Sequence, residues 1–288
     1  MDKKTAFERV IVIGYGAVTG EVLKLVHEKS IDYKYSVEYI EYEVHDFNTA
    51  KKYCLEKDVQ MTTITDKNEV TEYFDKISEK TLILSASNNY LIPKDILDKE
   101  YITAVNFHNA LLPKFPGRNA PSWVIYEGEK KTGITWHFVT SRVDAGRIII
   151  QKEIEIEEDI KAYELAGKLM TLAFEAFSEV YEGILLEKIE GSLQEVEKNR
   201  KMYLSKDVPG GGSFNISDSW EDIYRLLRAT DYGKYDIFPP ITVNINDEEM
   251  VVVRYKLLPC EKAKSGEDYL IIPADEGKAL QIKLKKAQ

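Results

Sequence analysis

The chain has 288 residues, and its 49 acidic side chains outnumber 39 basic ones to give a net charge of −10. This acidic balance argues against a broad nucleic-acid surface, and no apolar run reaches the roughly 18 residues of a membrane span. Two cysteines, Cys54 and Cys260, are too few for a disulfide framework or a cysteine-based metal site. Because the first residues also lack signal-peptide architecture, we expect a soluble, cytoplasmic protein.

The first half of the chain alternates strands and helices, which predicts a doubly wound, mostly parallel α/β sheet with helices on both faces. In chain order, we predict a strand at 9–14, a helix at 18–29, a strand at 36–42, a helix at 47–55 and strands at 81–85, 101–107, 132–140 and 147–156. A long helix with an apolar stripe is expected over residues 161–188.

The pattern changes after a glycine-rich linker at residues 208–213. We predict a short amphipathic helix over 219–229, capped by Ser219, and then strands at 241–245, 250–257, 269–272 and 280–284. These features indicate two domains. Residues 1–204 would form the large α/β domain, and residues 205–288 a small β-rich domain that could be barrel-like.

A glycine turn, Gly14-Tyr-Gly-Ala-Val-Thr-Gly20, follows the first strand and opens the first helix, as a dinucleotide-binding turn would. Glu41 or Glu43 could then contact a ribose. However, the third glycine is one place late, and any doubly wound domain needs glycine where its first strand turns tightly into a helix. An NAD-dependent Rossmann enzyme therefore stays open as one alternative function.

Two polar side chains mark the end of the strand predicted at 101–107. Asn106 and His108 are two residues apart, so they point to the same face, and ligands bind at the carboxyl ends of such strands. An amide donor can stabilise a developing oxyanion, and an imidazole can move a proton at neutral pH. Asp144, on a glycine-flanked loop, would hold the imidazole and favour its charged form. The alternative is that both residues are structural.

Several motifs lie within residues 80–155: Asn106-Phe-His108, Leu111-Leu112-Pro113, Gly117, Thr132-Gly133 and Asp144-Ala-Gly146. Together they resemble the folate-dependent formyltransferase family, which includes methionyl-tRNA formyltransferase, glycinamide ribonucleotide formyltransferase and sugar N-formyltransferases. The chain departs from the family at Asn109-Ala110, where Pro-Ser is usual. The resemblance implies a Rossmann-like formyltransferase domain over 1–204, with Asn106, His108 and Asp144 as the catalytic residues.

The resemblance also implies 10-formyltetrahydrofolate as formyl donor and no metal. Backbone groups of two loops bind the pterin in the family, and the matching positions in the first loop are Asn88, Asn89, Tyr90 and Leu91. His137, Leu112 and Gly117 would support the catalytic residues or contact the acceptor, although His137 could equally be an ordinary strand residue. The four histidines show no metal-ligand spacing with acids or cysteines.

Three acceptor classes are compatible with this family: initiator tRNA, a small phosphorylated amine, and an amino sugar or carrier-bound amine. A tRNA reader needs cations for phosphates, but residues 205–288 hold 12 Lys or Arg against 14 Asp or Glu. We therefore predict an N-formyltransferase acting on an amino sugar or another small or carrier-bound amine, with no nucleic-acid or membrane partner. Methionyl-tRNA formyltransferase is the first alternative, an inactive binding protein another, and a homodimer stays open.

Overall fold

The computed structural model describes residues 5–45, 48–198, 200–264 and 266–287, which form two compact units. Unit 1 consists of the chain up to Gly117, Thr132–Ile154 and Gly167–Met202. Unit 2 consists of Arg118–Lys131, Glu155–Ala166 and the chain from Tyr203 onward. The boundary predicted at 204/205 therefore lies close to the start of the last segment of unit 2. That residues 1–204 and 205–288 form separate domains stays a prediction.

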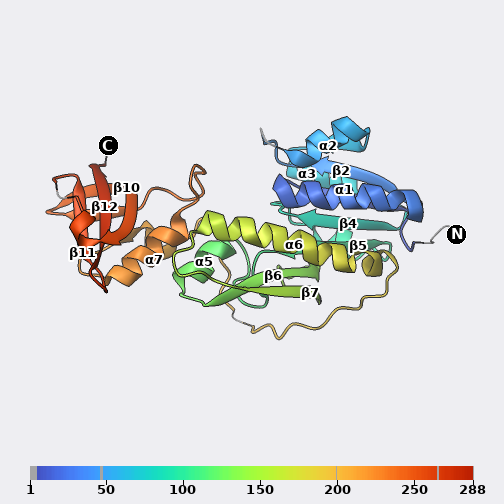
Figure 1. Ribbon diagram of the computed structural model, residues 1–288. Coiled ribbons are helices and arrows are strands. Elements are labelled where there is room, and N and C mark those ends of the chain that lie inside the picture. Colours follow the sequence, from blue (N-terminus) through green and yellow to red (C-terminus); the bar gives the residue numbers. More distant parts are fainter. Residues whose placement is uncertain (1–4, 46–47, 199, 265, 288) are drawn as a thin grey trace. The chain divides into compact units, whose positions relative to one another are not determined.

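Unit 1 is built on a seven-stranded sheet with the order β3-β2-β1-β4-β5-β6-β7 (Figure 1). Its strands are β1 (Arg9–Gly14), β2 (Ser36–Glu41), β3 (Gln60–Thr63), β4 (Thr81–Ala86), β5 (Ile102–His108), β6 (Lys131–Phe138) and β7 (Ile148–Glu155). The first five strands pair in parallel, and β6 pairs antiparallel with β5. The prediction of a mostly parallel α/β sheet is confirmed.

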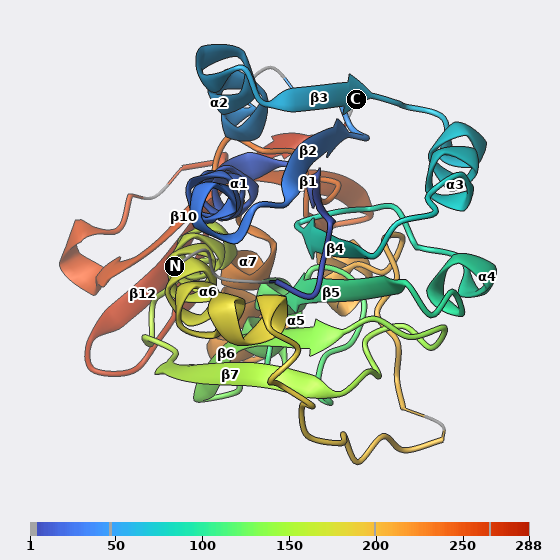
Figure 2. The ribbon, with the colours of Figure 1, turned by 90° about the vertical axis from the view of Figure 1, so that its right-hand side faces the viewer.

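Helices cover both faces of this sheet. They are α1 (Gly16–Tyr33), α2 (Thr49–Lys57), α3 (Lys67–Asp75), α4 (Lys94–Leu97) and α6 (Ala162–Leu185). Figure 2 shows α1 and α6 on one side of the strands and α3 and α4 on the other. The α3 side buries alternate strand residues such as Ile11 and Ile83 against Phe74. On the α6 side, the Trp136 indole packs on Phe177 and donates to the Ala173 carbonyl at 2.9 Å.

The structure adds several elements to those that the sequence predicted. They include β3, α3, α4 and a helix in unit 2, α5 (Ala120–Tyr126). Each is short, and α5 contains a proline and β-branched residues, so its helical pattern is weak. The helix predicted at 47–55 is α2, which begins after an Asn48 cap, and Phe47 lies outside the described residues.

Unit 2 contains a separate five-stranded sheet with the order β11-β12-β10-β9-β8. Its strands are β8 (Ser213–Phe214), β9 (Thr242–Ile245), β10 (Glu248–Pro259), β11 (Tyr269–Pro273) and β12 (Lys278–Lys286). The inner face of the sheet packs on α7 (Trp220–Thr230), which the Ser219 side chain caps as predicted. The segment predicted as a linker forms a short 3₁₀ turn, Pro209–Gly212. The expected β-rich C-terminal sheet is confirmed.

The glycine turn after β1 has a structural reason in this chain. Gly14 has a φ of 146°, and a Cβ atom there would lie 1.8 Å from the Ala86 carbonyl oxygen. The Thr19 hydroxyl donates to that same carbonyl. Glu41 is fully buried and accepts hydrogen bonds from Asn48, Lys51 and Thr63, each at 2.9 Å. Its carboxylate is therefore occupied by the fold rather than presented to a ribose.

We expect Gly14→Ala to destabilise the protein by more than about 2 kcal/mol, because β4 backbone must move to admit the methyl group. Gly167→Ala is the matched control, since Gly167 lies in α6 and a Cβ there meets no atom of the described residues within 4 Å. That change should leave stability equal or raise it by up to about 1 kcal/mol. Urea unfolding measures both, and equal stability of the two variants would show that the close approach is not a real constraint.

Candidate active site

The pairing of β5 with β6 builds one half of the candidate site. In this antiparallel register Asn106 lies opposite His137, and His108 lies opposite Thr135. Because strand side chains alternate, all four point to the same face of the sheet. Trp136, between two of them, points to α6 instead. The polar group therefore lies on the face opposite α6, at the carboxyl end of β5.

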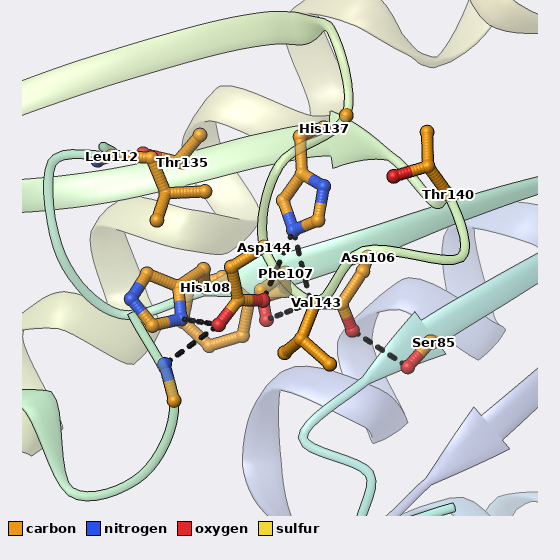
Figure 3. Close-up of polar contacts among 12 residues, drawn as sticks. Ser85, Asn106, Phe107, His108, Leu112, Thr135, His137, Thr140, Val143 and Asp144 are labelled. Carbon is orange, nitrogen blue, oxygen red and sulfur yellow. Dashed lines mark hydrogen bonds and ion pairs between the residues drawn. The ribbon is translucent and has the colours of Figure 1, made fainter. Parts of the chain in front are cut away.

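Asp144 lies between the two histidine rings, as Figure 3 shows. Its Oδ2 is 3.6 Å from His108 Nδ1, and its Oδ1 is 3.6 Å from His137 Nε2. The Gly117 amide donates to Oδ2 at 2.7 Å. Asp144 is only 9% exposed. The structure thus brings together five of the predicted site residues, which are Asn106, His108, Gly117, His137 and Asp144.

Backbone geometry and one arginine hold the Asp144 loop. Asp144 has a φ of 49°, in the left-handed region that aspartate tolerates better than most residues. Gly146 passes so close to the end of β6 that a Cβ there would lie 1.7 Å from the Phe138 carbonyl oxygen. The Arg200 guanidinium donates to the carbonyls of Val143 and Asp144, the latter at 3.0 Å. No sequence motif marks Arg200, and sequence reasoning missed it.

Burial controls the charge state of His108, which is 4% exposed. Burial lowers the pKa of this imidazole, and Asp144 raises it without compensating fully. Asp144 favours the charged imidazole, as the sequence predicted, but burial outweighs this effect, so His108 is neutral near pH 7. Its Nε2 lies 2.8 Å from the Phe115 carbonyl, which can only accept, so the proton sits on Nε2. The Nδ1 lone pair consequently faces Asp144.

Asp144 stays ionised although burial opposes its charge. Burial raises the pKa of the carboxyl group, but His108, His137 and the Gly117 amide together lower it well below its usual range. An ionised carboxylate can then stabilise positive charge on either imidazole.

Asn106 connects this cluster to β4. Its Nδ2 donates to the Phe107 carbonyl at 3.1 Å and to His137 Nε2 at 3.2 Å. Its Oδ1 accepts from the Ser85 hydroxyl at 2.7 Å (Figure 3). His137 Nδ1 donates to the Phe138 carbonyl at 2.8 Å, so that in the neutral ring Nε2 can accept from Asn106. His137 is thus a member of the cluster, and the β5–β6 register is the signal that identifies it.

Leu112 supports the cluster from the segment that follows β5. The Thr135 hydroxyl donates to the Ala110 carbonyl at 2.7 Å and accepts from the Leu112 amide at 3.1 Å. Gln151 donates to the Leu112 carbonyl at 2.8 Å. Ala110 is fully buried. These contacts hold the segment in place without a hydroxyl at position 110.

The loop predicted to bind the folate is partly closed on itself. The Asn88 side chain bonds both the amide and the carbonyl of Tyr90, at 3.0 and 2.9 Å. Tyr90 is buried, and its hydroxyl bonds Thr71 at 2.8 Å. Asn89 donates to Glu43. Leu91 is 59% exposed and is the most open of the four side chains. Folate binding by this loop stays a prediction.

Across residues 5–45, 48–198, 200–264 and 266–287, no group of three His, Cys, Asp or Glu is arranged to hold a metal ion. Within the same ranges, no helix combines the length and apolarity needed to span a bilayer.

The sheet and the polar cluster at the end of β5 define an α/β enzyme. Residues 8–181 match the family described as Formyl transferase, and the chain belongs to this family. The predicted resemblance is therefore confirmed. The chain is 29% identical to "Methionyl-tRNA formyltransferase" of Acetivibrio thermocellus over 80% of this chain and 75% of that protein. It is 28% identical to "GDP-perosamine N-formyltransferase" of Brucella melitensis over 66% and 71%.

The fold is also that of a solved sugar enzyme. The crystal structure of WlaRD, "a sugar 3N-formyl transferase in the presence of dTdp and 5-N-Formyl-THF", superposes with a TM-score of 0.71. The match covers 98% of this chain and 99% of WlaRD at 17% identity. It includes both sheets, so the α/β unit and the β-rich unit recur together in that protein.

We expect NMR titration of the histidine Cε1 protons to give His108 a pKa below its ordinary 6.5. In Asp144→Asn the pKa should fall further, because the carboxylate charge that raises it is removed. Glu43→Gln is the control, since its carboxylate lies 3.4 Å from the distant His45 ring and should leave His108 unchanged. A wild-type pKa above 6.5, or a rise in Asp144→Asn, would contradict this account.

Proposed function

We propose that the protein transfers a formyl group from 10-formyltetrahydrofolate to the primary amine of an amino sugar or a similar small or carrier-bound amine. The observation that carries the proposal is the buried cluster of Asn106, His108, His137 and Asp144. It combines an amide donor, neutral imidazole and an ionised carboxylate, the groups that acyl transfer to an amine requires.

Each residue of the cluster has a distinct task in this proposal. The donor supplies the electrophilic formyl carbon, which a neutral amine attacks. Asn106 would turn one Nδ2 hydrogen from the Phe107 carbonyl to the formyl oxygen, on which negative charge develops. His108 would accept the amine proton at Nδ1, because its Nε2 proton is held by Phe115. Asp144 would stabilise the resulting imidazolium. The imidazolium would return its proton to the donor nitrogen as the bond between that nitrogen and the formyl carbon breaks, so that tetrahydrofolate leaves. His137 would hold Asn106 in place.

Two observations support a folate donor. Asn88 bonds Ser85 at 3.5 Å and Ser85 bonds Asn106, so the predicted folate loop is linked to the cluster by hydrogen bonds. Leu91 extends an apolar side chain into solvent from this loop, and it could cover one face of the pterin ring. Reduced formylfolate in the WlaRD structure fits the same expectation.

Charge favours a small amine over tRNA. The acidic balance of residues 205–288 gives this part of the chain no net attraction for a polyanion. The similarity to the sugar enzyme WlaRD extends over both sheets and supports an amino-sugar acceptor. The similarity to a methionyl-tRNA formyltransferase keeps methionyl-tRNA as the alternative acceptor. A nucleotide-linked amino sugar is therefore the first substrate class to test.

We expect formylation of nucleotide-linked amino sugars and no efficient formylation of Met-tRNA. Both acceptors should be assayed with 10-formyltetrahydrofolate at about 50 and 200 mM salt, where phosphate contacts produce a steep loss of affinity. Titration with NADH should show no binding at concentrations at which a reduced folate analogue saturates. Rapid Met-tRNA formylation with a steep salt dependence would instead establish the alternative acceptor.

Substitutions in the cluster should lower kcat without preventing folate binding. Asn106→Ala should cost about 10²–10³-fold, the usual scale for one oxyanion donor. His108→Gln and Asp144→Asn should each cost at least about 10²-fold. The double variant should lose much less than the product of the single losses, because the two residues act as a unit. Full activity in any single variant, or strictly multiplicative losses, would refute these roles.

A further inference from the structure

The outer face of the unit 2 sheet carries a cluster of cations. In the register of β11, β12 and β10, Lys283 lies opposite both Arg254 and Tyr269, and Lys256 lies opposite Gln281. Neighbouring residues on these strands, such as Ile282, belong to the hydrophobic core on the other face. A one-residue shift in strand register would turn these cations toward the inner face and expose the core residues. The register that buries the core therefore also keeps the cations together on the outer face.

These side chains line a surface pocket of about 270 Å³. Arg254, Lys256 and Lys283 come from the sheet, and Lys262 and Lys264 come from the short 3₁₀ turn Cys260–Lys262 and the residues after it. Gln281 holds the side of the pocket that carries Lys264 against the sheet, because its Oε1 accepts from the Lys264 amide at 2.5 Å. Five cations thus converge on one small volume. We call them the basic pocket.

The charges of the basic pocket stay uncompensated among the residues that the structure describes. In the described part of the chain, none of its five cations forms an ion pair with an acidic side chain. Two other lysines of β12 do: Lys278 pairs with Glu276 at 3.3 Å and Lys286 with Glu248 at 2.9 Å. Arg254 instead donates to the Tyr269 hydroxyl at 3.1 Å, and nearby cations lower the pKa of this tyrosine. Both facts indicate a local surplus of positive charge.

Such an arrangement costs stability in the absence of a ligand. Like charges directly opposite each other on neighbouring strands repel, and Arg254 with Lys283 is such a pair. An anion between them would reverse the sign of the interaction. Arginine offers a planar pair of donors and lysine a compact charge, and both suit phosphate oxygens.

We propose that the basic pocket binds the diphosphate group of a small ligand, either free pyrophosphate or a nucleoside diphosphate. The distribution of charge argues against an extended nucleic acid. Five of the 12 basic residues of 205–288 lie in this pocket, which leaves 7 to face 14 acidic residues elsewhere. A long polyanion would meet that acidic surface, whereas a diphosphate needs only the pocket. The residues that line the pocket all belong to unit 2, whereas the polar cluster belongs to unit 1.

Calorimetric titration of the full chain with inorganic pyrophosphate tests the proposal. We expect binding that weakens as salt rises, and at least a roughly tenfold loss of affinity in Lys256→Gln/Lys283→Gln. The matched control is Lys278→Gln/Lys286→Gln, which removes two paired lysines of the same strand. Its affinity should stay within about twofold of wild type, because those charges are already compensated.

Thermal unfolding provides a second readout that does not depend on catalysis. Arg254→Gln should raise the melting temperature without ligand, since it relieves the cross-strand repulsion, and should reduce the rise that pyrophosphate produces. Competition of GDP or dTDP with pyrophosphate distinguishes a nucleoside diphosphate ligand from free pyrophosphate. Displacement of pyrophosphate by the nucleotide indicates a nucleotide ligand, and failure to displace it indicates the free ion. Equal pyrophosphate affinity in the pocket and control variants would overturn the proposal. So would binding of RNA that excess pyrophosphate cannot displace.

Discussion

The carboxylate of Asp144 is the group on which the rest of the site depends. An ionised carboxylate is expensive to bury unless hydrogen bonds and opposite charges compensate it. Here the Gly117 amide donates to the carboxylate, and two imidazoles from other segments of unit 1 lie 3.6 Å away and lower its pKa when they carry a positive charge. Because the charge must be satisfied from three directions, the segments that carry Gly117, His108 and His137 are fixed relative to one another.

This arrangement also separates the roles of two chemically identical rings. His108 and His137 flank the same carboxylate, but their protons sit on opposite nitrogens. A carbonyl holds the Nε2 proton of His108, and another carbonyl holds the Nδ1 proton of His137. His108 is left with a lone pair near the charge, and His137 uses its lone pair to orient an amide. Backbone carbonyls, rather than the side chains themselves, therefore decide which nitrogen of each ring can take up a proton.

Much of the fold was predictable because the buried strands are continuous apolar runs bounded by turns. The period of two residues in a strand was also enough to place Asn106 and His108 on one face. The role of His137 depends on the β5–β6 register, which no local pattern encodes. Arg200 acts across tertiary contacts that its neighbours in sequence do not signal. The charge of His108 depends on how deeply it is buried, and the sequence could suggest only the neighbouring acid.

Unit 2 is assembled from three separate segments of the chain, which limits where the protein can be truncated or fused to another protein. Residues 118–131 and 155–166 belong to this unit, although they lie between strands and helices of unit 1. Arg118 donates to the Tyr203 carbonyl, Ser122 bonds the Tyr232 hydroxyl, and Lys161 pairs with Asp231. A chain ending at residue 204 would keep these two segments and lose Tyr232 and Asp231. Grafting the last 84 residues onto another scaffold would likewise leave buried surface of α7 uncovered. An exchange of unit 2 between relatives would therefore have to move three separate stretches of chain at once.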